Sequence, residues 1–253
     1  MKKFISIVIA TYNSQDTLEK CLNSIIIQKD DSIELIIVDG NSSDKTIEIT
    51  EKYISDIDIV ISEHDEGIYD AWNKGIELSN SEWIMFVGSD DQLLPNCIEI
   101  YKKEASFNSD IDYISGKIMI INKEGRHLRE FGQPYSWKTF RSIMNLAHVS
   151  ALHNHKIYSK YGLYDVDYKI CGDYELLLRP GNQLKTIFID DILGKMTTGG
   201  VSYGSFSALK ESKNAKLKHY TKFIVLIYID YFLSIIRLAL KKLLYKVRIL
   251  KDL

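Results

Sequence analysis

Segments typical of strands and helices alternate four times within the first 105 residues, and this alternation constrains the fold more than any other feature. Each of four apolar, strand-like runs is followed by a segment in which apolar residues recur at helical spacing. The expected strands are residues 5–10, 33–38, 57–61 and 83–87, and the expected helices are residues 14–28, 47–54, 68–78 and 95–105. Such alternation predicts an α/β fold with a doubly wound, mostly parallel sheet.

The pattern changes after residue 107. The sequence there predicts strands at residues 112–122, 127–131, 185–190 and 192–198, and helices at residues 137–144, 154–161 and 171–179. No internal repeat is present, so a solenoid or propeller is excluded.

Two adjacent carboxylates, Asp90 and Asp91, follow the fourth strand in the stretch WIMFVGSDD. In open α/β sheets, ligands bind outside the carboxyl ends of the strands. Like charges placed together repel each other, and a divalent cation relieves that repulsion. The pair is therefore a candidate cation site. The alternative is a polar turn in which one aspartate caps the next helix.

Polar residues also follow the first two strands, at the same predicted edge of the sheet. These residues are Thr11, Tyr12 and Asn13 after the first strand and Asp39 after the second. A carboxylate at the position of Asp39 can accept hydrogen bonds from a ribose or a base, or it can cap the adjacent helix. The chain contains neither G-x-G-x-x-G nor a P-loop, so a bound diphosphate would need a cation as its counter-charge.

Four motifs, in this order and spacing, resemble the inverting family 2 glycosyltransferases, in particular the small bacterial enzymes that build capsule, O-antigen or exopolysaccharide. The motifs are VIATYN, VDGNSSDKT, DEGIYDAWNKGI and GSDD. His148, GLYD and CGDYELLLR also match, so the resemblance covers roughly residues 4–203. It implies a GT-A fold, a nucleotide-sugar donor (a UDP-sugar is expected) and a divalent cation, Mg²⁺ or Mn²⁺. It further implies a nucleotide-sugar-binding half at residues 1–107 and an acceptor-side half at residues 108–205.

The resemblance also assigns roles by position. Asp91 corresponds to the metal ligand and Asp90 to a contact with ribose or sugar hydroxyls. Gly88 departs from the family pattern, because many members have an acidic or amide residue there. The remaining donor-binding candidates are Thr11, Tyr12, Asn13, Asp39, Asp65, Gly67, Asp70, Asn73 and Lys74.

Asp173 matches the catalytic base of the family, although Gly172 replaces the glutamate that often precedes it. The reaction needs a base because a sugar hydroxyl is a poor nucleophile until its proton is removed. The alternative for Asp173 is helix capping. No Q-x-x-R-W follows, which favours the addition of a single sugar over processive synthesis.

Two further residues are weaker candidates. His148 could contact a metal or the acceptor, or it could be structural. Arg179 could pair with a phosphate, or with Glu175 at the helical i,i+4 spacing.

Charge is unevenly distributed along the chain. Residues 209–253 contain 11 Lys and Arg against 3 Asp and Glu, whereas the preceding 208 residues contain 21 against 31. An acidic body argues against general binding to nucleic acid. The three scattered cysteines favour a reducing, cytoplasmic compartment.

The tail, residues 206–253, is basic and rich in apolar residues. Its longest uncharged run, residues 223–229, is short of the roughly 20 residues that span a bilayer. The sequence therefore predicts amphipathic helices lying on the inner face of the membrane. The alternative is a helical hairpin packed on the body or on a second subunit.

These features leave three hypotheses for the function. The leading hypothesis is an inverting, cation-dependent glycosyltransferase acting on a saccharide or lipid-linked acceptor at the membrane. A sugar nucleotidylyltransferase should have a glycine-rich basic loop after the first strand, and TYNSQDT is not such a loop. The third hypothesis is a non-catalytic protein that binds nucleotide sugars or acts as a membrane scaffold.

Overall fold

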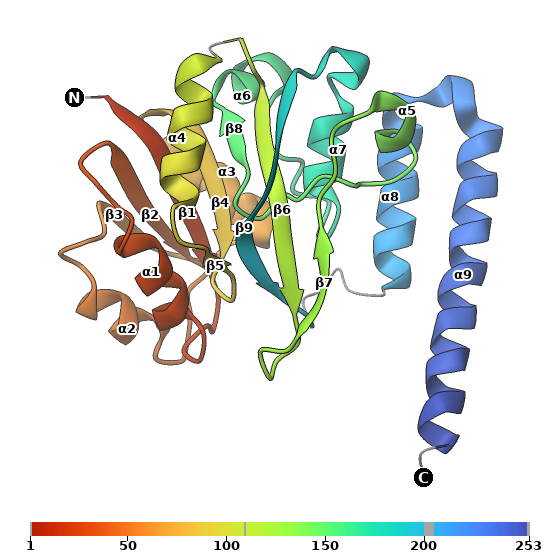
Figure 1. The fold of residues 1–253 in the computed structure, drawn as a ribbon, viewed down its shortest axis with the longest axis horizontal. Coiled ribbons are helices and arrows are strands. Elements are labelled where there is room, and N and C mark those ends of the chain that lie inside the picture. The colour runs from red at the N-terminus through yellow and green to blue at the C-terminus, as the bar shows by residue number, and fades with distance from the viewer. Residues whose placement is uncertain (1, 109, 200–204, 252–253) are drawn as a thin grey trace.

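A computed structural model describes residues 2–108, 110–199 and 205–251 as a curled α/β sheet with helices on both faces and a helical hairpin beside it (Figure 1). The first half contains parallel strands β1 (Lys3–Thr11), β2 (Ile33–Asp39), β3 (Ile59–Ser62) and β4 (Ser81–Gly88) in the order β3-β2-β1-β4. Helices α1 (Leu18–Ile26), α2 (Thr46–Lys52), α3 (Ile68–Leu78) and α4 (Cys97–Phe107) connect or follow these strands. The predicted strand–helix alternation is confirmed.

Both faces of this sheet are buried, which explains the nearly continuous apolar runs. Ile5, Ile7 and Ile9 on β1 pack in one core with residues of α1 and α4. Val8 points to the opposite face and packs in a second core with residues of α3, including Trp72. Alternate residues of one strand therefore support two helical layers.

Beyond β4 the sheet continues in the order β4-β8-β6-β9-β5, and all of these added strands except β5 come from the second half of the chain. The strands involved are β5 (Gln92–Leu93), β6 (Tyr113–Ile121), β8 (Leu152–Asn154) and β9 (Thr186–Thr197), and β7 (His127–Phe131) pairs with β6. β8 runs antiparallel to β4 and β6, whereas β6 and β9 are parallel. The sheet is therefore mixed but mostly parallel, as predicted.

Three local predictions differ from the structure. Residues predicted to begin a helix at 154 instead complete the buried strand β8, and helix α6 spans Lys156–Tyr161. The two strands predicted at 185–190 and 192–198 form one strand, β9, whose register with β6 shifts on both sides of Lys117. The helix predicted at 137–144 is limited to α5 (Trp137–Phe140). Pairing with distant strands outweighs local propensity at β8 and β9.

The remaining helices are α7 (Gly172–Leu178), α8 (Phe206–His219) and α9 (Ile224–Lys251), with short 3₁₀ turns at Gly181–Gln183 and Thr221–Phe223. α8 lies beside α7, and α9 returns antiparallel to α8 (Figure 1). The boundary expected between residues 205 and 206 falls at the start of α8. Residues 200–204, which precede this boundary, lie outside the described part of the chain.

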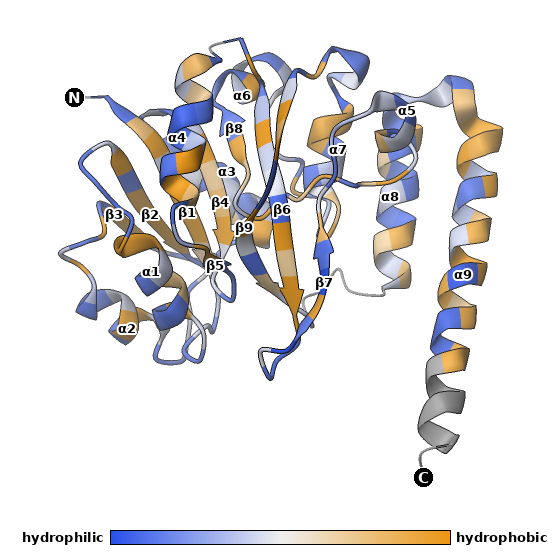
Figure 2. Ribbon diagram, viewed as in Figure 1, coloured by the Kyte–Doolittle hydropathy of each residue, from blue (hydrophilic) through white to orange (hydrophobic). Residues whose placement is uncertain are grey.

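α9 belongs to an apolar segment that is longer than the uncharged run at residues 223–229. Within the described residues, one segment, Thr221–Leu244, is long and apolar enough to cross a membrane by length and composition. The segment includes Asp230, which ends the uncharged run at residue 229, and Arg237. Apolar residues extend along the helix in Figure 2.

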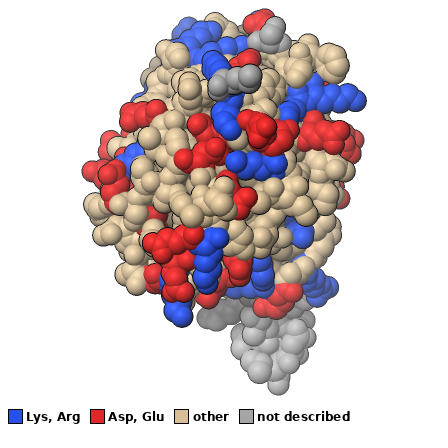
Figure 3. Space-filling view, turned by 90° about the vertical axis from the view of Figure 1, so that its left-hand side faces the viewer, with Lys and Arg blue, Asp and Glu red and all other residues tan. Residues whose placement is uncertain are grey.

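The face that carries β3 and α2 has interspersed acidic and basic side chains (Figure 3). Mixed charges of this kind produce little long-range field.

Candidate functional site at the carboxyl edge of the sheet

The ends of β1, β2 and β4 lie level with one another. Thr11 pairs with Asp39 across β1 and β2, and Ala10 pairs with Gly88 across β1 and β4. The loops that follow these strands are also joined, since the hydroxyl groups of Ser14 and Ser89 lie 2.7 Å apart. The structure thus brings the candidate residues after three strands to a single edge, as the sequence predicted.

Asp91 is a buried carboxylate that lacks full hydrogen bonding. Asp91 is 5% exposed, and its Oδ1 has no hydrogen-bond partner among the described residues. Burial, followed by the charge of Asp90, raises its pKa well above the ordinary value. Partial burial also raises the pKa of the more exposed Asp90. A buried charge without compensation is costly, and a cationic ligand would supply the compensation that this pair lacks.

Gly88 provides the space into which both carboxylates fold. A Cβ atom at this position would lie 2.6 Å from Asp91 Oδ2 and 3.1 Å from Asp90 Oδ1. Glycine at the position where the family often has an acidic or amide residue thus allows Asp90 and Asp91 to converge here.

The donor set fits a hard divalent cation that is shared with a ligand. No group of three or more His, Cys, Asp or Glu side chains in the described ranges could hold a metal without other ligands. Mg²⁺ is commonly bound by one or two carboxylates, with water and substrate phosphates completing its shell. Asp91, with its unpaired oxygen, would be the protein ligand of such an ion, and Asp90 lies beside it.

Asp39 organises the loop after β2 in this structure. Its fully buried carboxylate accepts four hydrogen bonds, from Thr11 Oγ1 (2.9 Å), Ser42 Oγ (2.5 Å), Ser42 N–H (2.9 Å) and Ser62 Oγ (2.8 Å). A carboxylate has about four acceptor positions, so all are in use. The predicted contact with a base would require one of these bonds to be exchanged.

The loop after β1 is hydrogen-bonded to the loop after β2. Asn13 adopts a positive φ of 49°, and its Oδ1 accepts a hydrogen bond from the Ser43 N–H at 2.9 Å. Tyr12 is 66% exposed beside this loop. An exposed aromatic ring at this edge of the sheet is available for stacking on a planar base.

Two of the donor-binding candidates, Asp65 and Gly67, lie in the turn that leads into α3. Gly67 has a φ of 124°, which favours glycine, and its N–H donates to Asp65 Oδ1 at 3.0 Å. Asp65 itself lies against Gly40, the residue after β2, because a Cβ atom on Gly40 would be 2.6 Å from Asp65 Oδ2. Gly67 and Asp65 therefore lie close to the carboxyl edge.

The other three candidates on α3 are engaged in protein contacts. Lys74 pairs with Glu63 at 2.8 Å and with Asp70 at 3.5 Å. Asn73 makes two hydrogen bonds with the backbone of Tyr164, both at 2.9 Å. In this structure these side chains fix α3 and its neighbouring loop.

Asp173 lies in the first turn of α7, next to α3. The Tyr69 hydroxyl on α3 is 3.3 Å from Asp173 Oδ1 and donates to the Ile170 carbonyl at 2.8 Å. The Tyr69 ring packs on Gly172, where a Cβ atom would approach the ring to 2.8 Å. The glycine that departs from the family pattern therefore gives Tyr69 close access to the segment of Asp173.

His148 is part of a buried aromatic cluster. It stacks on Trp72, with ring centroids 4.7 Å apart, and its Nε2 lies 3.1 Å from the Tyr164 hydroxyl. Burial lowers its pKa, while the charge of Asp173 opposes this effect. The contacts correspond to the structural alternative that the sequence left open.

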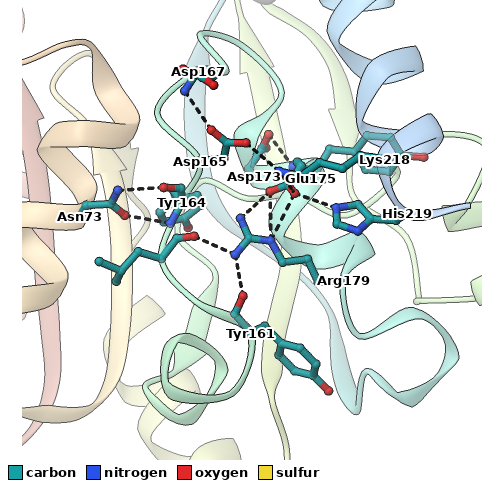
Figure 4. A network of polar contacts seen from close by, with 12 residues as sticks. Asn73, Tyr161, Tyr164, Asp165, Asp167, Asp173, Glu175, Arg179, Lys218 and His219 are labelled. Carbon is teal, nitrogen blue, oxygen red and sulfur yellow. Dashed lines mark hydrogen bonds and ion pairs between the residues drawn. The ribbon is translucent and has the colours of Figure 1, made fainter.

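Arg179 forms the predicted i,i+4 pair with Glu175 (Figure 4). Its guanidinium donates two hydrogen bonds to Glu175 Oε2, and it also donates to the carbonyls of Tyr161 and Leu163. His219 and Lys218 on α8 contact the same fully buried glutamate, at 2.7 and 3.2 Å. Arg179 therefore takes part in joining α7 to α6 and α8.

Sequence reasoning missed Ser42, Ser62, Tyr69 and Thr197 as neighbours of the candidate residues. Thr197 donates to the Asp90 carbonyl at 3.2 Å from the end of β9. No spacing rule could find Thr197 or Tyr69, because each lies about 100 residues from its partner in sequence. Ser62 could have been inferred from its position at the end of the third strand.

The chain belongs to the glycosyl transferase family 2, whose family model matches residues 6–166. A PGL/p-HBAD biosynthesis glycosyltransferase of Mycobacterium tuberculosis is 27% identical over 180 residues, which cover 69% of this chain and 68% of the relative.

Two solved structures share the fold. S. aureus TarS 1–349 in complex with UDP-GlcNAc has a TM-score of 0.67 at 16% identity, covering 86% of this chain and 67% of that chain. The mannosyltransferase PcManGT from Pyrobaculum calidifontis, in complex with GDP-Man and Mn²⁺, has a TM-score of 0.66 at 14% identity. The match covers 92% of this chain and 70% of that chain. The architecture is therefore the GT-A fold, and the protein is a bacterial glycosyltransferase of family 2.

Proposed function

We propose that the chain is an inverting, cation-dependent enzyme that moves one sugar from a nucleoside-diphosphate sugar, a UDP-sugar in the first instance, to a hydroxyl group of a saccharide or lipid-linked saccharide. Its product contributes to bacterial surface polysaccharide. The observation that carries the proposal is the buried, incompletely bonded carboxylate of Asp91, which meets Asp90 over Gly88 at the carboxyl edge of a family 2 fold. The UDP-GlcNAc and GDP-Man complexes of similar folds support a nucleotide-sugar donor.

Asp91 is the proposed metal ligand, and Asp90 contacts ribose or sugar hydroxyls. A bound divalent cation neutralises charge on the departing diphosphate. Tyr12 and the loop of Thr11 and Asn13 hold the nucleoside, while Asp39 maintains the shape of that loop through its four hydrogen bonds.

Asp173 is the proposed general base. It takes the proton of the acceptor hydroxyl while the acceptor oxygen forms a bond to the anomeric carbon of the donor. The bond between that carbon and the diphosphate oxygen breaks, and the nucleoside diphosphate leaves. Attack from the opposite side inverts the configuration at the anomeric carbon.

The test is a comparison of Asp173→Asn with the wild-type protein. A panel of nucleotide sugars with Mn²⁺ or Mg²⁺, assayed for donor hydrolysis and transfer, first identifies the donor. Asp173→Asn should then reduce transfer at least 10²-fold, the lower end of the effect of a general base, without changing donor affinity or the melting temperature. Asp167→Asn, at an exposed position of the preceding loop, is the control and should remain active. Undiminished transfer by Asp173→Asn would refute the assigned role.

We further propose that α9 binds the membrane surface, where a lipid-linked acceptor would be found. One side of the helix carries exposed apolar side chains and no charged residue among those described. It comprises Val225, Tyr228, Ile229, Phe232, Leu233, Ile236, Leu240 and Leu243. Lys222, Arg237, Lys241 and Lys242 belong to the same segment and suit a surface of anionic phospholipid.

Contacts with α8 favour a helix that lies on the membrane over one that spans it. Lys216 pairs with Asp230 at 2.6 Å, and Lys242 lies 4.5 Å from the ring of Phe206. These contacts attach α9 along its length to a helix with four lysines. If α9 crossed the bilayer in this arrangement, the polar helix α8 would enter the hydrocarbon region at a high cost in free energy.

A further inference from the structure

Helix α8 contacts the backbone of the segment that leads into Asp173. The Glu211 carboxylate on α8 accepts hydrogen bonds from the N–H groups of Ile170 at 2.8 Å and Cys171 at 2.9 Å. The N–H of Lys169 lies 3.2 Å from each of its oxygens. Three consecutive amides thus converge on one carboxylate, immediately before α7 begins at Gly172.

These hydrogen bonds hold residues 169–171, which lack a side-chain cap for α7. The Cys171 side chain does not cap α7, and its thiol donates instead to the Ala208 carbonyl of α8 at 3.3 Å. Hydrogen bonds to an ionised carboxylate are roughly twice as strong as those between neutral groups. Glu211 therefore supplies the main polar restraint on this side of residues 169–171.

Tyr69 restrains the same segment from the opposite side. Its hydroxyl donates to the carbonyl of Ile170, whose N–H is bound by Glu211. Ile170 is consequently held through both of its backbone polar groups, by α3 on one side and by α8 on the other. Asp173 follows three residues later and also lies within 3.3 Å of Tyr69.

Separate contacts fix α8 itself. Lys218 and His219 bind Glu175 on α7, and Lys218 also pairs with Asp165 at 2.7 Å. Glu211 therefore acts from an anchored helix and can hold the loop in one position.

We propose that Glu211 is a positioning residue for Asp173, so that α8 is part of the catalytic unit and not only a link to the membrane. The proposal rests on the assignment of Asp173 as the base. A small displacement of a catalytic group can reduce the rate about 10²-fold, which makes such a restraint important for turnover.

The experiment compares Glu211→Ala and Glu211→Gln in the full chain, using the donor that the panel identifies. Glu211→Ala should lower kcat at least 10-fold and leave the KM for the donor within 2-fold of wild type. Glu211→Gln should recover part of kcat, because its amide oxygen still accepts an N–H. Lys210→Ala, at an exposed neighbouring position on α8, is the matched control and should retain the wild-type kcat.

Hydrogen exchange measured by mass spectrometry provides a second readout that does not depend on activity. The peptide containing residues 169–171 should exchange faster in Glu211→Ala, whereas the peptides of β1 and β4 should be unchanged. Wild-type kcat in Glu211→Ala would overturn the proposal. Equal loss of kcat and donor affinity together with faster exchange throughout the fold would also overturn it, since that result describes general destabilisation.

Failure of the base assignment gives a different result. In that case Asp173→Asn retains transfer while Glu211→Ala still accelerates exchange at residues 169–171. The catalytic role of Glu211 would then be refuted together with that of Asp173, and only its contact with the loop would remain.

Discussion

The unpaired oxygen of Asp91 has a consequence for stability at the scale of a single residue. The raised pKa means that folding favours the protonated carboxyl group. Without a cation, the contribution of Asp91 to stability is therefore greatest below its unfolded pKa of about 3.8 and is lost as the pH rises through the folded pKa. Stabilisation by a divalent cation instead increases with pH, because the cation binds the deprotonated carboxylate.

We therefore expect Asp91→Asn to be more stable than wild type at pH 7 without a cation, by about 1 kcal/mol or more. For a chain of this length, 1 kcal/mol corresponds to about 2–4 °C in melting temperature. Mn²⁺ should raise the melting temperature of the wild type, more at pH 8 than at pH 5, and should have little effect on Asp91→Asn. Differential scanning fluorimetry across this pH range measures both effects.

Asp31→Asn is the control for this experiment, because Asp31 is exposed and lies just before β2, at the opposite end of the strand from the site. It should retain the Mn²⁺ response of the wild type. An equal response in Asp91→Asn would contradict the role of Asp91 as a metal ligand.

The sequence could predict which carboxylates reach the sheet edge but not their surroundings. Asp90 and Asp91 follow an apolar run directly, so their position depended only on the strand prediction. The four bonds to Asp39 include one from Ser62, which is 23 residues away and is brought close by the pairing of β2 with β3. Distant partners of this kind decide whether a carboxylate is free to bind a ligand.

At the scale of elements, Glu175 joins α7 to α8. Burial alone would raise its pKa, but hydrogen bonds from His219 and Arg179 outweigh burial and lower the pKa to about 2. A lowered pKa contributes stability that is present above the unfolded pKa of about 4.5 and is lost as the pH falls toward 2. A shift of this size corresponds to about 3 kcal/mol.

Glu175→Gln should therefore reduce the free energy of unfolding at pH 7 by about 2–4 kcal/mol, and the difference from wild type should shrink below pH 4.5. Urea unfolding at pH 7 and pH 3 measures this change. Glu48→Gln is a matched control, because Glu48 forms an exposed i,i+4 pair with Lys52 and should cost less than about 0.5 kcal/mol. Equal losses in the two variants would show that the Glu175 cluster does not stabilise the α7–α8 contact.

Elements with a strong local pattern were predictable, whereas those defined by distant pairing were not. β1, β2 and β4 are buried on both faces, so their apolar runs identified them without further context. β8 has only three residues, and its pairing with β4 and β6 joins segments about 40–70 residues away. The Glu175–Arg179 pair was predictable because helical spacing is local, but His219 could not be assigned to it from sequence.

At the scale of the whole molecule, α9 leaves an apolar surface on the outside of the described protein. Phe232 is 63% exposed and Ile236 is 39% exposed, although both are large apolar residues. Burying each side chain in lipid would contribute about 1.5–3 kcal/mol. Basic residues near an anionic surface add about 1 kcal/mol each, and this contribution weakens as salt screens it.

The full chain should therefore bind vesicles containing phosphatidylglycerol more tightly than vesicles of phosphatidylcholine alone, and added salt should weaken the binding. The double variant Phe232→Glu/Ile236→Glu should reduce the affinity at least about 100-fold, because two apolar contacts are lost. Vesicle flotation measures both effects. Phe107→Glu, at a position on α4 that is 76% exposed, is the control and should leave binding unchanged.

Two alternative arrangements of α9 would give different experimental results. If α9 spans the bilayer, alkaline carbonate will not release the protein from membranes, whereas a helix on the surface is released. If a second copy covers the apolar side, sedimentation will show a dimer that the double variant converts to monomer, and vesicles will not compete with it. The contacts of Lys216 and Lys242 keep α8 alongside α9, so we expect release by carbonate and a monomer on the membrane. Glu211, which holds residues 169–171 from α8, would then belong to the helix pair that lies on that surface.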